Sequence, residues 1–152
     1  MRPFRQVLLV FALAALAVAP RLQAQGPRVI NLTAGDTMSY SMPTINAKPG
    51  EQLKIVLKVT TAQPPEALKH NFVLLAPDTD PMAFSMAAVM AKDTGYIPAD
   101  YKAKILAHSE MAAGGQEATV TFKAPAKPGT YPYVCTFPGH FFAGMKGSLI
   151  VK

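Results

Sequence analysis

The sequence predicts an all-β sandwich with one short helical insertion. Apolar and polar residues alternate in three short runs, at residues 38–42, 53–59 and 119–123. This is the pattern of strands that have one buried face and one wetter face. Two denser apolar runs, at residues 70–75 and 147–151, suit strands that are covered on both sides. Turns rich in Gly and Pro separate the runs, and several short strands joined in this way favour a sandwich.

Residues 81–92 depart from the β pattern and are expected to form the helical insertion. Met82, Met86 and Met90 recur every four residues in an Ala-rich segment, which favours a helix. Such a stripe could be a soft copper(I) site, because thioethers bind that ion. The favoured interpretation is that the three side chains fill irregular gaps beneath a helix packed on the sandwich.

The first 24 residues have the pattern of a signal peptide. Arg2 and Arg5 supply a positive start, residues 7–19 are apolar, and residues 22–24 form a small-residue cleavage site. The apolar run is shorter than the roughly 20 residues that span a bilayer as a helix. We therefore expect residues 25–152 to form one domain that is exported to the periplasm. The alternative is an uncleaved segment that is retained as an anchor and keeps the protein membrane-associated.

The charge of the mature chain argues against nucleic-acid binding. The formal net charge is +6, and removal of Arg2, Arg5 and Arg21 with the signal peptide would leave +3. The lysines are scattered and do not form the basic stripe that phosphate binding needs. We expect no nucleic-acid partner, no stable membrane span in the mature form, and a monomer.

The cysteine content is the sharpest feature of the composition. Exported domains usually carry an even number of cysteines in disulfides, but this chain contains only Cys135. A lone thiol in an oxidising compartment is a liability unless it is buried, catalytic or bound to metal. Cys135 is therefore a candidate functional residue.

The segment that follows Cys135 has the residue types of a copper site. His140 lies five positions after Cys135, and Met145 lies five positions later. A turn at residues 138–139 and a bend at Gly144 allow one loop to bring a thiolate, an imidazole and a thioether to one ion. A trigonal set of two His and one Cys with a distant axial Met is the electron-transfer arrangement of copper.

This arrangement needs a second histidine, for which the chain offers two candidates. His70 opens an apolar run directly after a loop, so it is expected at the end of the sandwich where ligands can converge. His108 precedes a polar turn and is better explained as a solvated or structural residue. We therefore favour His70 and keep His108 as the alternative.

The sequence resembles the cupredoxins, in particular their azurin and auracyanin branch. The resemblance covers most of the mature chain, in the order of the family, at residues 70–74, 105–108, 120–122, 135–140 and 145–147. It implies a Greek-key sandwich with one type 1 (blue) copper site. It also implies electron transfer between redox protein partners, with no enzymatic activity.

The resemblance also implies ligand roles. His70, Cys135 and His140 correspond to the strong equatorial ligands, and Met145 corresponds to the weak axial one. The four residues between His140 and Met145 match auracyanin, whereas azurin has one fewer. Lys69 stands where azurin has a glycine whose carbonyl lies close to copper.

Four further residues are expected around the site. Asn71 matches a position that steadies the ligand loop and the thiolate by hydrogen bonding, and the Phe137 backbone N–H can donate to the sulfur. Phe141 and Phe142 follow His140 directly and could form an apolar collar at which a redox partner docks. The alternative is that one or both rings pack into the loop.

Two other function classes use some of the same residues. A copper carrier or store could use the same ligands without redox work. A hydrolase or thiol enzyme could use Cys135 activated by an imidazole, although no orienting Asp or Asn follows an obvious triad pattern.

Overall fold

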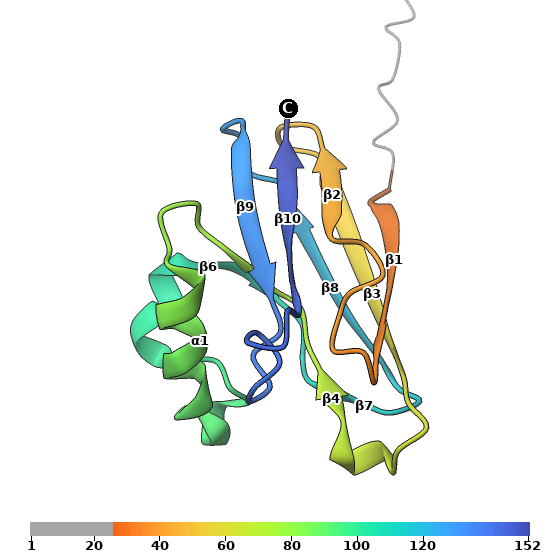
Figure 1. Ribbon diagram of the computed structural model, residues 1–152. Coiled ribbons are helices and arrows are strands. Elements are labelled where there is room, and N and C mark those ends of the chain that lie inside the picture. Colours follow the sequence, from red (N-terminus) through yellow and green to blue (C-terminus); the bar gives the residue numbers. More distant parts are fainter. Residues whose placement is uncertain (1–25) are drawn as a thin grey trace, which may run out of the picture.

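The computed structural model describes residues 26–152, which fold into two packed β-sheets (Figure 1). The predicted signal peptide, residues 1–24, lies outside the described residues. One sheet has the order β1 (Arg28–Gly35), β3 (Gln52–Thr60), β8 (Glu117–Lys123). Strand β1 runs parallel to β3, and β8 runs antiparallel to it. Strand β1, the first strand of the described chain, therefore forms one edge of this sheet.

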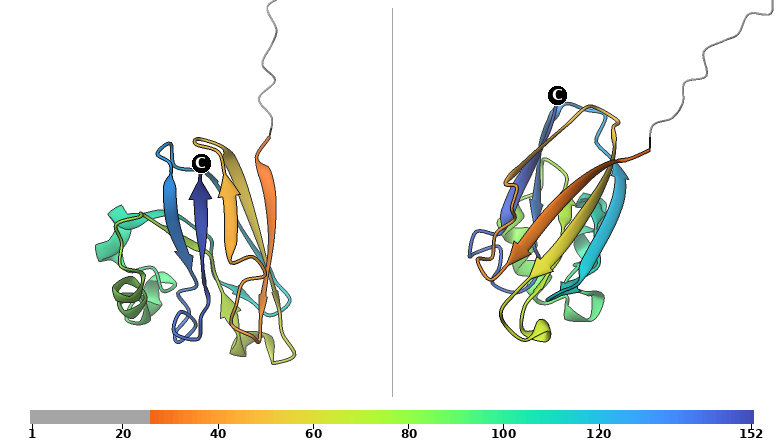
Figure 2. Two further views of the ribbon diagram at one scale, coloured as in Figure 1. Left: turned by 45° about the horizontal axis from the view of Figure 1, so that its top comes forward. Right: turned by 90° about the vertical axis from the view of Figure 1, so that its right-hand side faces the viewer.

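The second sheet has five strands, in the order β2, β10, β9, β5, β6. Their bounds are β2 (Thr44–Ala47), β10 (Lys146–Val151), β9 (Gly129–Val134), β5 (Val73–Leu75) and β6 (Ile105–His108). A separate short pair joins β4 (Lys69–His70) to β7 (Ala112–Ala113). The two layers are seen edge-on in the right-hand view of Figure 2. The predicted all-β sandwich is confirmed.

The core lies between the two sheets and follows the predicted alternation. In β3, the side chains of Leu53, Ile55, Leu57 and Val59 are buried, while those between them reach the outer face. The facing sheet contributes buried apolar residues such as Leu149 of β10. The runs at residues 53–59, 119–123 and 147–151 all lie in strands, as expected.

Two of the predicted strands differ from the structure. Residues 38–42 form no strand and contribute only a bridge between Tyr40 and Ala34. The run at residues 70–75 is divided, because β4 pairs with β7 whereas β5 joins the five-stranded sheet between β6 and β9. The chain crosses between these pairings at Asn71 and Phe72. This crossing leaves His70 at the end of the sandwich.

The predicted helical insertion is present as α1 (Pro81–Val89). The Asp80 carboxylate caps it by accepting from the backbone N–H groups of Met82 and Ala83, and Pro81 occupies the first turn, where its missing N–H costs nothing. The described residues also contain three short 3₁₀ helices, η1 (Pro65–Ala67), η2 (Lys92–Thr94) and η3 (Ala99–Lys104). No helix within residues 26–152 has the length and apolar character needed to cross a bilayer.

The orientation of α1 corrects the expectation for its methionines. The buried residues of the helix are Phe84, Ser85 and Ala88. Phe84 packs with Val73 and Val134 of the five-stranded sheet, in a cluster that also holds Leu75 and Phe141. The large aromatic ring decides which face turns inward, so the Met stripe faces solvent. The prediction that the methionines fill gaps beneath the helix is wrong.

Candidate metal centre

The predicted ligands meet at one end of the sandwich. Cys135 directly follows β9, Met145 directly precedes β10, and His140 lies in the loop between them. His70 comes from β4, which lies beside this loop. In Figure 1 the loop is the dark blue segment at the lower end of β9 and β10, away from the C-terminus.

Backbone hydrogen bonds hold the loop in its shape. The Met145 N–H donates to the His140 carbonyl at 2.9 Å, and the Cys135 N–H donates to the Met145 carbonyl at 3.2 Å. Gly139 and Gly144 have φ angles of 85° and 105°, a backbone region that residues with side chains rarely adopt. The two glycines therefore allow the turns that the sequence predicts at these points.

Three donor atoms converge in the buried interior of this end. Cys135 Sγ lies 3.5 Å from His140 Nδ1 and 3.8 Å from His70 Nδ1, and the two Nδ1 atoms are 3.0 Å apart. All three residues are buried. An ion with bonds of roughly 2.0–2.3 Å to nitrogen and sulfur suits donors at these separations. His108 lies exposed on β6 and has no place in this cluster.

Met145 lies in the same interior. Its side chain is fully buried and belongs to the core cluster that contains Cys135. Its backbone bonds to both Cys135 and His140, as described above. This position is compatible with the expected axial role, which stays a prediction.

Burial dominates the electrostatics of the cluster. It raises the pKa of the Cys135 thiol to about 11 and lowers the pKa of His140 to about 4, with the nearby His70 adding to the second effect. Burial also lowers the pKa of His70, although the Gly35 carbonyl and the Asp36 carboxylate partly oppose this. Neutral imidazoles are ready to bind a metal, and a cation would offset the cost of forming a thiolate.

Hydrogen bonds brace the cysteine and the segment that carries His70. The backbone N–H groups of Asn71 and Phe137 hydrogen-bond to the Cys135 sulfur and act to lower its pKa. The Asn71 side chain hydrogen-bonds to Thr136. The Asn71 backbone carbonyl accepts a 2.6 Å hydrogen bond from the Tyr40 hydroxyl. Sequence reasoning identified Asn71 and Phe137 but missed Thr136 and Tyr40. Tyr40 lies 31 residues from its partner, so no local pattern could have indicated it.

The two phenylalanines after His140 lie in different surroundings. Phe142 is 58% exposed. Phe141 is only 8% exposed, packs with Phe84 and Val134, and has the Lys146 ammonium 4.9 Å from its ring centre. The expectation that both rings could form a docking collar is therefore corrected for Phe141, because helix α1 and β9 enclose it.

Comparison with known proteins agrees with this geometry. The family model of copper binding proteins of the plastocyanin/azurin family matches residues 28–152. The chain belongs to this family. The cupredoxin is 33% identical to azurin of Bordetella pertussis over 150 residues, which cover 96% of this chain and 97% of that one. The cluster of His70, Cys135 and His140 is a candidate type 1 copper site.

Auracyanins are also similar to this cupredoxin. Auracyanin-B of Chloroflexus aurantiacus is 44% identical over 85 residues. This match covers 55% of this chain but only 36% of that relative's length. The solved structure of auracyanin A, described as a "blue" copper protein from the same organism, matches with a TM-score of 0.73 and 32% identity. The match covers 84% of this chain and 100% of that one, and it confirms the cupredoxin fold.

Proposed function

We propose that this chain is a type 1 (blue) copper electron-transfer protein that shuttles single electrons between exported or membrane-associated redox partners. The observation that carries the proposal is the convergence of two imidazole Nδ1 atoms and one cysteine sulfur, 3.0–3.8 Å apart, in the buried end of a cupredoxin sandwich. Copper, when bound there, supplies a one-electron couple between Cu(I) and Cu(II).

The proposed ligand roles follow from the donor types. His70, Cys135 and His140 would hold the ion as its strong donors, and the buried Met145 would supply a weaker thioether donor. The two backbone N–H groups at the sulfur stabilise its negative charge and tune the reduction potential.

The surroundings of the ligands favour fast electron exchange. Backbone bonds close the loop, and hydrogen bonds from Asn71 join it to the His70 segment. A cage that is braced in this way changes little in shape when its charge changes. Little rearrangement of ligands and solvent then has to accompany the movement of an electron.

The environment of Cys135 argues against a thiol enzyme. The sulfur is fully buried, and burial raises the pKa of the thiol to about 11. Reactive cysteines are partly exposed and have a lowered pKa, because the thiolate is the nucleophile. We therefore propose no catalytic role.

Phe142 is the proposed docking residue. It lies two positions after the ligand His140 and keeps most of its ring in solvent. A small apolar contact suits a partner that must bind, exchange an electron and leave. We further propose that the mature protein is a monomer that acts in the periplasm after removal of residues 1–24.

The visible spectrum of the copper-loaded protein tests this function. We expect an intense band toward the red end of the visible range, from thiolate-to-Cu(II) charge transfer, that disappears on reduction and returns on oxidation. A colourless Cu(II) protein would contradict the trigonal thiolate site. A blue protein that exchanges electrons only slowly, even with small redox reagents, would favour the copper carrier instead.

A further inference from the structure

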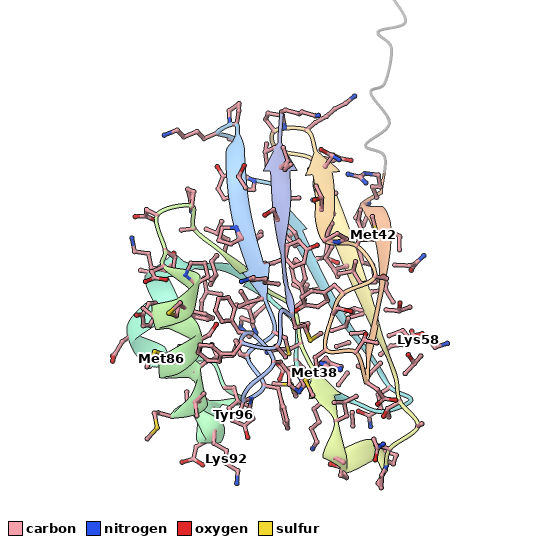
Figure 3. The ribbon with its side chains drawn as sticks, in the orientation of Figure 1. Met38, Met42, Lys58, Met86, Lys92 and Tyr96 are labelled. Atoms are coloured by element: carbon pink, nitrogen blue, oxygen red, sulfur yellow. The ribbon has the colours of Figure 1, made fainter. Side chains whose placement is uncertain are left out.

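The outer face of helix α1 is a row of exposed methionines. Met82, Met86 and Met90 are 54%, 60% and 86% exposed, respectively. Phe84 and Ala88 anchor the opposite face of the helix in the protein. Figure 3 labels Met86 on this helix, at the side of the molecule away from the β1 edge of the sandwich. The exposed thioethers of Met82 and Met86 therefore lie on one face of the helix, and that of Met90 follows directly at its C-cap.

Their spacing brings neighbouring sulfurs within reach of one another. Residues four apart lie on the same face of a helix, with Cβ atoms about 5–6 Å apart. Met has three rotatable side-chain bonds and adapts its shape easily. Met82 with Met86, or Met86 with Met90, can thus direct two sulfurs at one ion, and Met86 is common to both pairs.

The chemistry of this face selects a soft ion. Helix α1 contains no charged residue and no histidine. The Asp80 carboxylate at its start accepts hydrogen bonds from the first turn. Thioethers bind Cu(I), whereas Zn²⁺ and Ca²⁺ prefer nitrogen, thiolate or oxygen donors. The donor set therefore favours a monovalent soft cation over the common divalent ones.

We propose that the outer face of helix α1 is a second metal site, which holds Cu(I) between thioether sulfurs with Met86 as the shared ligand. It has no residue in common with the buried cluster and does not depend on the redox function proposed for that cluster. The helix packs through Phe84 against Val134 and Phe141, beside the ligand loop. Cu(I) from solution would thus bind at the protein surface, on a helix that packs beside the buried centre.

A titration of the reduced, copper-loaded protein with Cu(I), without oxygen, tests the proposal. We expect one further equivalent of Cu(I) to bind, with shifts of the NMR ε-methyl signals of the three stripe methionines. Met86→Leu keeps the apolar face and should weaken this binding at least tenfold, and Met82→Leu and Met90→Leu should weaken it less. Met42→Leu is the matched control, since Met42 is exposed in another part of the chain and should leave the binding unchanged.

Three results would overturn the second site. They are unchanged Cu(I) binding by Met86→Leu, equal binding of Zn²⁺, and methyl shifts that follow protein concentration but not Cu(I). The last would identify the helix face as a protein-docking surface. The blue band after reoxidation reports separately on the buried centre, so loss of one site is distinguishable from loss of the other.

Discussion

The side chain of Asn71 pairs with Thr136 and so joins the segment that carries His70 to the segment that carries Cys135. Its Oδ1 accepts from the Thr136 backbone N–H at 2.9 Å, and its Nδ2 donates to the Thr136 hydroxyl at 2.7 Å. Asn71 follows His70 and Thr136 follows Cys135, so the pair ties together two candidate ligands that are 65 residues apart. On both segments, the residue that makes the hydrogen bonds directly follows the candidate ligand.

Replacing Asn71 should therefore destabilise the fold and alter the site. Asn71→Ala leaves the buried Thr136 N–H and hydroxyl without a partner, which costs about 2–6 kcal/mol of unfolding free energy at ~1–3 kcal/mol for each group. Urea denaturation measures this cost, and voltammetry should record a changed reduction potential. Thr136→Ser keeps both hydrogen bonds and is the control. Equal stability of Asn71→Ala and the wild type would show that the brace contributes little.

Replacing the cysteine should abolish the colour. Cys135→Ser changes the soft thiolate to a hydroxyl, which is a poor ligand for Cu(I), so the intense visible band should vanish and copper should bind more weakly. Absorption spectroscopy and copper titration measure both effects. His108 lies outside the cluster, so the control variant His108→Ala should keep the band. A Cys135→Ser variant that stays intensely blue would rule out the thiolate as the source of the colour.

Replacing Met145, the proposed axial ligand, should change the reduction potential more than the stability of the fold. Met145→Leu has nearly the same volume, so the free energy of unfolding should fall by less than about 1.5 kcal/mol. Loss of the thioether, a donor that helps to set the balance between Cu(II) and Cu(I), should raise the reduction potential while the blue colour remains. Voltammetry measures the change. If the potential does not move, Met145 is a core residue and not a ligand.

A charge at the exposed phenylalanine should slow partner exchange. Phe142→Glu introduces a carboxylate on a ring that is 58% exposed and belongs to no buried cluster, so the visible spectrum should stay the same. Electron exchange with the physiological partner should slow at least several-fold, as measured by stopped-flow absorbance. Phe142→Leu retains an apolar surface and should exchange at nearly the normal rate. A shifted spectrum in Phe142→Glu would mean that this ring supports the copper site instead.

The close approach of Gly147 and Tyr133 also makes a stability prediction. A Cβ at Gly147 would overlap the Tyr133 ring, whose hydroxyl donates to the Met42 carbonyl. Because this buried ring has little freedom to move, Gly147→Ala should destabilise the fold by about 1–3 kcal/mol in urea denaturation. Gly26→Ala, where a Cβ meets nothing within 4 Å, is the control. Equal midpoints for the two variants would mean that the ring shifts freely.

The sequence by itself determined the features that local contacts produce. The alternation in residues 53–59 predicted a buried strand, because a strand places successive side chains on opposite faces. The spacing from Cys135 through His140 to Met145, with glycines at its bends, predicted a metal loop whose backbone bonds close within 11 residues of chain, from 135 to 145. In each case the sequence pattern and the structure that it predicts involve the same short stretch of chain.

Only the tertiary structure decided the features that depend on distant parts of the chain. It placed His70 beside Cys135, paired Asn71 with Thr136, and enclosed Phe141. It also turned the methionines of the α1 segment outward, because Phe84 packs against the five-stranded sheet and so fixes the rotation of the helix. Contacts across 65 residues depend on how the whole core packs, and neither spacing nor periodicity records that packing.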